Sequence, residues 1–145
     1  MISLVIFKQE PVRIPRNSIE KLFKRIIGKE SDKHAQGEIN LIFTNDKNIQ
    51  QLNKKYRRKN KPTDVLSFNL EKTSGRNMVF GEVYISVQTS ARQAMEYSTS
   101  LNEEFLRLFC HGLLHLLGYD HIKPVERRKM EARERNYLKS FMAWN

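Results

Sequence analysis

The sequence contains a single cysteine, Cys110, and no long run of apolar residues. One cysteine excludes an internal disulfide framework and is typical of proteins in a reducing cytosol. The apolar opening, residues 1–7, is too short for a membrane span and lacks the basic start and small-residue cleavage site of a signal peptide. We therefore expect a soluble, cytoplasmic protein with no membrane association.

Acidic residues are also scarce relative to basic ones. The chain has 26 Lys and Arg against 16 Asp and Glu, which gives a formal net charge of +10. Such a field favours polyanionic partners such as RNA, and charge that serves only solubility is the alternative. The length fits one domain, residues 1–145, which can bury about two thirds of its unfolded surface.

Hydrophobic periodicity and capping signals divide the chain into short elements. Strands are predicted at residues 2–7, 38–44, 63–68 and 78–86, with an exposed polar loop at residues 69–77. Helices are predicted at residues 17–27, 46–56, 87–97 and 100–117, and from residue 124 onward. This order predicts a single α+β domain, a small mixed four-stranded sheet packed with about five helices.

Several local details are predicted within these helices. Asn17 or Ser18 should cap the first helix, and Gly28 should end it. Tyr56 is expected on the inner face of the second helix. Residues 126–135 of the last helix are expected to face water. The apolar residues expected to pack inward from that helix are Met130, Tyr137, Leu138 and Phe141.

Three of the four histidines fall within eleven residues. His111 and His115 are four residues apart, so on a helix both project from the same face. Gly118 can adopt the left-handed conformation that ends a helix, and the chain can then turn back to present His121 as a third ligand. Three protein ligands leave a fourth position open, which is the pattern of catalytic zinc sites. We therefore expect a zincin-like metal helix with one Zn²⁺ per chain.

Other interpretations of this stretch need to be considered. Satisfied core histidines are common, but clustering argues against them, since His34 is the only other histidine. Cys110 points about 100° away from His111 around the helix, so we expect a buried core thiol and not a fourth ligand. The spacing is also that of metzincin peptidases, which carry a glutamate base after the first histidine, where this chain has Gly112.

The densest positive charge lies at residues 54–61, directly before the strand at residues 63–68. This segment predicts either a solvated helix end or a phosphate-binding patch. If the strand lies beside the metal helix, an arginine here can stabilise charge on a phosphate. The basic residues of the segment are Lys54, Lys55, Arg57, Arg58, Lys59 and Lys61.

Three stretches together carry a resemblance to a known family. They are Tyr56-Arg57 with Lys61-Pro62-Thr63-Asp64-Val65-Leu66-Ser67-Phe68, then Gly81-Glu82-Val83 with Ile85-Ser86, then His111-Gly112-Leu113-Leu114-His115-Leu116-Leu117-Gly118-Tyr119-Asp120-His121. In these stretches the chain resembles the bacterial YbeY family of rRNA maturation factors. Two departures are visible: Glu82 stands where many members have Asp, and residues 58–60 replace a commoner Gly-x-Asp stretch.

Members of that family are single-domain, zinc-binding endoribonucleases that process 16S rRNA, particularly its 3′ end, and act in ribosome quality control. The resemblance implies a metal-dependent hydrolase with His111, His115 and His121 as zinc ligands and Arg57 as the catalytic arginine. The five lysines and arginines around Arg57 are expected to add RNA affinity. The implied partners are precursor 16S rRNA, the small ribosomal subunit and its assembly factors, and we expect a monomer.

The general base is the open part of this mechanism. Asp120 or Glu82 is expected to act either as the base or as the partner of a histidine. Attack by water and attack by the ribose 2′-hydroxyl are both open. The alternatives to a nuclease are a non-catalytic RNA-binding ribosome-assembly factor with a structural metal and a metzincin-like peptidase, which would need a carboxylate near the metal from elsewhere in the chain.

Overall fold

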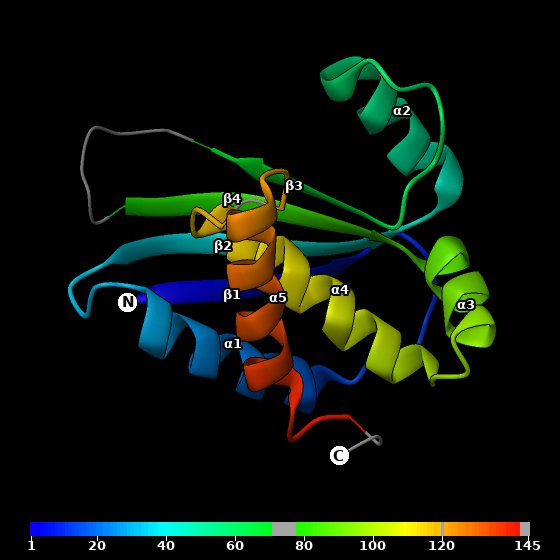
Figure 1. The fold of residues 1–145 in the computed structure, drawn as a ribbon. Helices are drawn as coiled ribbons and strands as arrows, with labels where there is room; N and C mark the ends of the chain where they lie inside the picture. Colours follow the sequence, from blue (N-terminus) through cyan, green and yellow to red (C-terminus); the bar gives the residue numbers. More distant parts are fainter. Residues whose placement is uncertain (71–77, 120, 143–145) are drawn as a thin grey trace.

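Four strands form one mixed sheet in the structure, a computed structural model that describes residues 1–70, 78–119 and 121–142. The strands are β1 (Ile2–Lys8), β2 (Gln36–Thr44), β3 (Val65–Asn69) and β4 (Met78–Ser86), in the order β1-β2-β4-β3. β1, β2 and β4 are parallel, whereas β3 pairs antiparallel with β4 and lies at the edge (Figure 1). The predicted mixed four-stranded sheet is confirmed.

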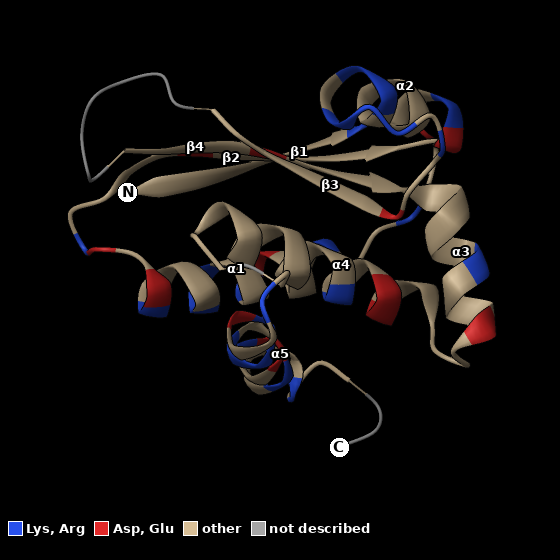
Figure 2. Cartoon of the chain, turned by 45° about the horizontal axis from the view of Figure 1, so that its top comes forward, with Lys and Arg blue, Asp and Glu red and all other residues tan. Residues whose placement is uncertain are grey.

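Five helices surround this sheet in the described part of the chain. They are α1 (Arg16–Glu30), α2 (Asp46–Arg57), α3 (Val87–Glu96), α4 (Leu101–Leu116) and α5 (Pro124–Leu138). Helices α1 and α4 cover one face of the sheet, and α5 packs beneath them, whereas α2 lies on the other side of the sheet at one end (Figure 2). The α+β fold is therefore as predicted. None of these helices is long and apolar enough to cross a membrane.

The core lies between the sheet and helices α1 and α4. Alternate residues of the central strands point into it, as the two-residue period of a strand requires, and Phe43 meets Phe105 of α4 edge to face at 4.9 Å. Helix α4 is therefore packed along most of its length, which fixes the direction of its remaining polar side chains. The fully buried residues on both sides include Ile39, Leu41, Val83, Ile85, Ile19, Leu22, Ile26, Leu108 and Phe109.

Two local predictions about α1 are wrong. The helix begins at Arg16 behind Pro15, with no side-chain cap from Asn17 or Ser18, and it continues past Gly28 to Glu30. Glycine costs a helix about 1 kcal/mol relative to alanine, and the buried residues on the inner face of α1 offset that cost. The loop predicted at residues 69–77 lies mostly outside the described residues, and Asn69 itself is the last residue of β3.

The position of Tyr56 also differs from the prediction. It was expected on the inner face of α2, but 57% of the residue is exposed. The buried residues of α2 are Asn53 and Ile49, one and two turns earlier, so the last turn of the helix is not covered by the core. Tyr56 instead rests on the ring of Phe68 from β3.

Helix α4 lies unusually close to strands β3 and β4 at Gly112. A Cβ atom at this position would stand 2.7 Å from Val83 Cγ1 and 2.9 Å from Ser67 Oγ. The Ser67 hydroxyl donates a hydrogen bond of 2.9 Å to the Gly112 carbonyl. The absence of a side chain at Gly112 is therefore what allows the helix to approach the edge of the sheet.

We expect Gly112→Ala to destabilise the fold by about 1–3 kcal/mol, because the added methyl group overpacks the contact with Val83 and Ser67. Gly28→Ala is the matched control, since nothing lies within 4 Å of a Cβ there, and it should stabilise α1 by about 0.5–1 kcal/mol. Urea unfolding of both variants measures the difference. Equal changes in the free energy of unfolding for Gly112→Ala and Gly28→Ala would contradict the close approach of α4 to β3 and β4.

Candidate active site

Helix α4 holds His111 and His115 on one face. The helix is opened by a complete capping box, in which the Ser100 hydroxyl accepts from the Glu103 amide and the Glu103 carboxylate accepts from the Ser100 amide. Its other faces are buried, so the two histidines are left on the side that looks toward β3. The centroids of their rings are 5.1 Å apart, and the two ring planes are inclined at 73°.

The end of α4 turns the chain back as the sequence predicts. Gly118 has φ +105°, the left-handed region that favours glycine. The Tyr119 amide donates to the Leu114 carbonyl at 3.0 Å, and the Gly118 amide donates to the His115 carbonyl at 3.1 Å. This pair of bonds is the Schellman motif, which satisfies the last carbonyls of the helix and directs the following residues back toward His111 and His115.

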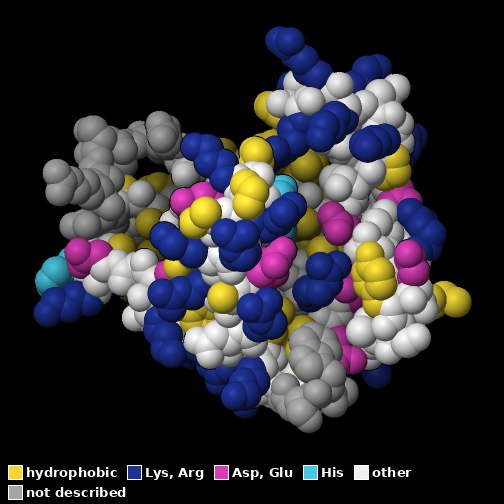
Figure 3. Space-filling model, in the orientation of Figure 1, with side chains coloured by type: hydrophobic (Ala, Val, Ile, Leu, Met, Phe, Trp, Pro, Cys, Tyr) yellow, Lys and Arg dark blue, Asp and Glu magenta, His cyan; other side chains and the backbone are white. Residues whose placement is uncertain are grey.

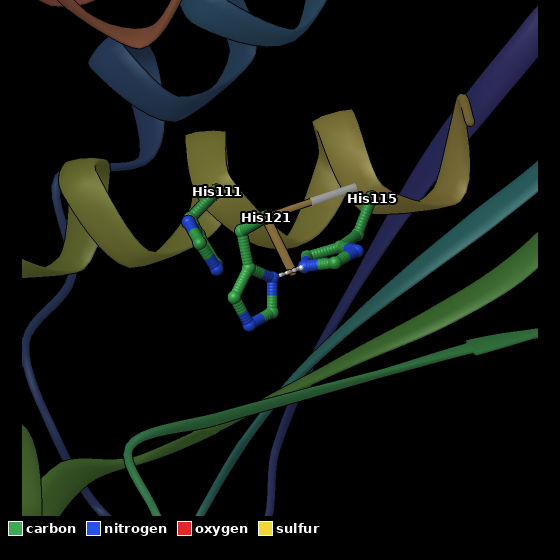
Figure 4. A group of neighbouring side chains, drawn as sticks. All are labelled: His111, His115 and His121. Atoms are coloured by element: carbon green, nitrogen blue, oxygen red, sulfur yellow. Dashed lines mark hydrogen bonds between the residues drawn. The ribbon is translucent and has the colours of Figure 1, made fainter. Parts of the chain in front are cut away.

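His121 joins the other two histidines after this turn. The ligand nitrogens of the three residues all lie within 4.8 Å of one another. His115 Nε2 and His121 Nδ1 are 2.6 Å apart, so both point at the same space (Figure 4). Three imidazoles converging in this way can hold a metal ion. Cys110 stays out of the cluster: it is fully buried, and burial, with the charge of Glu134 adding to it, raises the pKa of its thiol far above the usual range.

Glu134 of α5 is a site residue that the sequence analysis missed. Its Oε1 lies 2.7 Å from Nδ1 of His111, and both side chains are mostly buried, at 16% and 28% exposed. The residue falls in the stretch 126–135 that was expected to face water. The sequence did hold a signal for this position. Glu134 is four residues after Met130 and three before Tyr137, so it lies on the same face of α5 as these two buried residues.

A cleft of about 420 Å³ joins the histidines to the basic segment. Arg57, Lys59 and Lys61 line it together with the three histidines, so the structure brings these residues to one site. Lys54 and Lys55 lie outside the lining, on the exposed side of α2. Arg58 caps α2 with φ 58°, a left-handed conformation that favours glycine.

Arg57 is anchored to the edge strand. Its Nη2 donates to the Ser67 carbonyl at 3.0 Å, and its guanidinium lies 5.7 Å from the centroid of the Phe68 ring. Ser67 also donates to Gly112 of the histidine helix. The strand therefore does lie beside the histidine helix, and Arg57 reaches the same cleft from its outer edge.

Glu82 is not at this site, which corrects one of the two expectations for a base. Its neighbours in β4, Gly81 and Val83, face Leu116 and Gly112 of α4, so Glu82 points to the opposite face of the sheet. There it accepts a hydrogen bond of 3.1 Å from the Tyr84 hydroxyl, and burial together with this carboxylate raises the pKa of Tyr84 to about 12. Asp120, the other expected base, lies outside the described residues.

Within the described part of the chain, Asp64 is the carboxylate that lines the cleft. Its Oδ1 accepts from the Val65 amide at 2.7 Å, and its Oδ2 accepts from Gln93 Nε2 at 3.3 Å. Gln93 Nε2 also donates to the buried Glu104 at 2.6 Å, and Glu104 is held by Arg107 through two bonds of 2.8 Å. This network ties the start of β3 to helices α3 and α4.

Known proteins are similar to this chain over most of its length. The family model described as Endoribonuclease YbeY matches residues 4–142. A protein named endoribonuclease YbeY from Aquifex aeolicus is 48% identical over 103 residues, which cover 71% of this chain and 69% of that protein. One of the same name from Francisella philomiragia is 35% identical over 138 residues, 90% of this chain and 85% of that protein.

A solved structure shares the fold. The solution structure of TM1509 from Thermotoga maritima superposes with a TM-score of 0.60 at 25% sequence identity, covering 95% of this chain and 91% of that one. The family model spans both the basic segment and the three histidines that meet in the cleft. The resemblance seen in the sequence is therefore confirmed, and the chain belongs to the endoribonuclease YbeY family.

Proposed function

We propose that this chain is a zinc-dependent endoribonuclease of the bacterial cytoplasm that cleaves RNA phosphodiesters in the maturation of 16S rRNA. The observation that carries the proposal is the cleft in which three histidines face Arg57, Lys59 and Lys61. Relatives named endoribonuclease support the reaction class. The small ribosomal subunit, and particularly the 3′ end of its precursor RNA, is the substrate that we infer from the family resemblance.

The donor set fits zinc. Three neutral imidazoles with no thiolate leave a fourth position for substrate or water, as in catalytic zinc sites. Zinc in this position would supply Lewis-acid polarisation of a phosphoryl oxygen and activation of water. Glu134 would orient one of the ligands. Its carboxylate accepts a hydrogen bond from Nδ1–H of His111, which leaves the Nε2 lone pair of that ring for the metal.

Arg57 supplies the charge that a phosphodiester requires. Its guanidinium is planar and keeps its positive charge, so it can hold two phosphate oxygens and offset negative charge that develops during cleavage. The Ser67 carbonyl and the Phe68 ring orient it before the substrate arrives. Lys59 and Lys61 in the cleft, with Lys54, Lys55 and Arg58 outside it, add affinity that does not depend on RNA sequence.

A peptidase is disfavoured by the surroundings of Gly112. The position that carries the glutamate base in metzincins is filled here by Val83 and Ser67 of the sheet. Asp64, a carboxylate in the cleft lining, is already bonded to the Val65 amide and to Gln93.

A non-catalytic assembly factor would bind precursor 16S rRNA without cutting it. A cleavage assay with the native protein, its chelated form and His115→Ala distinguishes this alternative.

The chain should retain one zinc, and His111→Ala combined with His115→Ala should abolish retention because two of three ligands are lost. His34→Ala is the matched control, since His34 is exposed and lies outside the cluster. Elemental analysis of the purified variants makes the measurement. Zinc retained at one equivalent in the double variant would rule out this site.

Glu134→Gln should weaken zinc affinity by about 10-fold and Glu134→Ala by up to about 100-fold, because His111 loses the carboxylate that orients its ring. Competition with a chromophoric chelator at fixed pH measures this affinity directly, without relying on activity. Glu131→Gln, on the exposed side of the same helix, should leave it unchanged. Equal zinc affinities in Glu134→Gln and Glu131→Gln would mean that the contact of Glu134 with His111 does not support metal binding.

Arg57→Ala should slow cleavage of bound RNA by about 10²–10³-fold while weakening RNA binding much less, since the guanidinium acts on charge that develops in the transition state. Lys54→Ala should instead weaken binding and flatten its salt dependence. Arg57→Lys keeps the charge but loses the planar fork, so it should remain strongly impaired. Single-turnover rates and titrations at several salt concentrations separate these effects, and full activity of Arg57→Lys would remove Arg57 from the active site.

A further inference from the structure

Tyr56 is an exposed aromatic side chain directly before the arginine of the cleft. It lies in the last turn of α2, and 57% of the residue is accessible to solvent. Arg57 follows it in the chain and lines the cleft with the three histidines. An aromatic ring at this place has no part in the core and none in the proposed handling of the phosphate.

The ring is nevertheless held in place by a row of aromatic contacts. Tyr56 packs edge to face on Phe68 with centroids 5.2 Å apart at 61°, and Phe68 packs in the same way on Tyr84 at 5.9 Å and 76°. Phe68 belongs to β3 and Tyr84 to β4, so the row rests on the face of the sheet that carries Glu82, away from the histidines. Arg57, bonded to the Ser67 carbonyl of the edge strand, connects this face to the cleft. A ring supported in this way loses little conformational freedom when a ligand stacks on it.

Positive charge is interleaved with these rings. The Lys55 ammonium lies 5.2 Å from the centroid of Tyr56, and the Arg57 guanidinium lies 5.7 Å from that of Phe68. Figure 3 shows basic side chains gathered over α2 and again over α5. Exposed aromatic faces among lysines and arginines are the pattern by which proteins bind single-stranded nucleic acid, since the rings take the bases and the cations take the phosphates.

We propose that Tyr56 is a stacking platform for one unpaired base of the RNA, in the nucleotide next to the phosphate that Arg57 holds. This inference rests on the proposed function, because it assigns a base to the substrate that the cleft cuts.

The test is RNA binding by fluorescence anisotropy with a short unpaired oligonucleotide, in a His115→Ala background that prevents cleavage. Tyr56→Ala should weaken binding by about 5- to 150-fold, and Tyr56→Phe should bind like the parent because the ring is kept. The slope of affinity against salt should stay unchanged in Tyr56→Ala, whereas Lys55→Ala should reduce it by about 0.7. Tyr97→Ala is the matched control, since Tyr97 is 55% exposed and also carries a cation, Arg107, over its ring at 5.9 Å.

Abasic nucleotides placed one by one along the oligonucleotide provide the second measurement. At one position, an abasic nucleotide should reduce the affinity of the protein that keeps Tyr56 as much as Tyr56→Ala reduces it with the intact oligonucleotide. Tyr56→Ala should then lose no further affinity for that abasic oligonucleotide. If RNA binds but no abasic position matters and Tyr56→Ala equals Tyr97→Ala, stacking on Tyr56 is wrong while the nuclease proposal stands. If the oligonucleotide and precursor 16S rRNA both fail to bind, the proposed function itself is wrong.

Discussion

The approach of helix α4 to the edge strand β3 is the constraint on which the geometry of the site depends. Gly112 has no side chain, so the helix comes near enough for the Ser67 hydroxyl to donate to the Gly112 carbonyl. The carbonyl of Ser67 accepts from Arg57 on its outer side. One residue of the strand thereby ties the histidine helix and the arginine to the same edge, so the backbone sets the distance between the histidines and Arg57.

The same contact explains why a histidine spacing shared with peptidases leads to different chemistry here. A glutamate in place of Gly112 would have to displace Val83 and Ser67, so the sheet occupies the position of the peptidase base. Within the described residues, a carboxylate reaches the histidines from α5 instead, where Glu134 lies 2.7 Å from Nδ1 of His111. The side of the cleft formed by residues 57–61 carries Arg57, Lys59 and Lys61, and positive charge of this kind favours a polyanion.

Features that depend on neighbouring residues in the chain were predicted correctly. The capping box of Ser100 and Glu103, the left-handed turn at Gly118 and the spacing of His111 and His115 act over a few residues, so their geometry is the same wherever the helix packs. The order of strands and helices and the mixed sheet followed from periodicity for the same reason. Predictions about α1 failed at Asn17, Ser18 and Gly28 because burial of its inner face outweighed weak local signals for its ends.

What only the tertiary structure decided concerns residues that meet across the chain. Glu134 looked like one charge among many on a basic helix until the packing of α5 on α4 brought it to His111, 23 residues earlier. Glu82 and Tyr56 were misplaced because the face of a strand or helix turn that is covered depends on which element packs against it. The sequence by itself determined the three metal-ligand candidates and the basic segment. Their union in one cleft required strand β3 to lie beside α4, a contact between distant segments that no local pattern encodes.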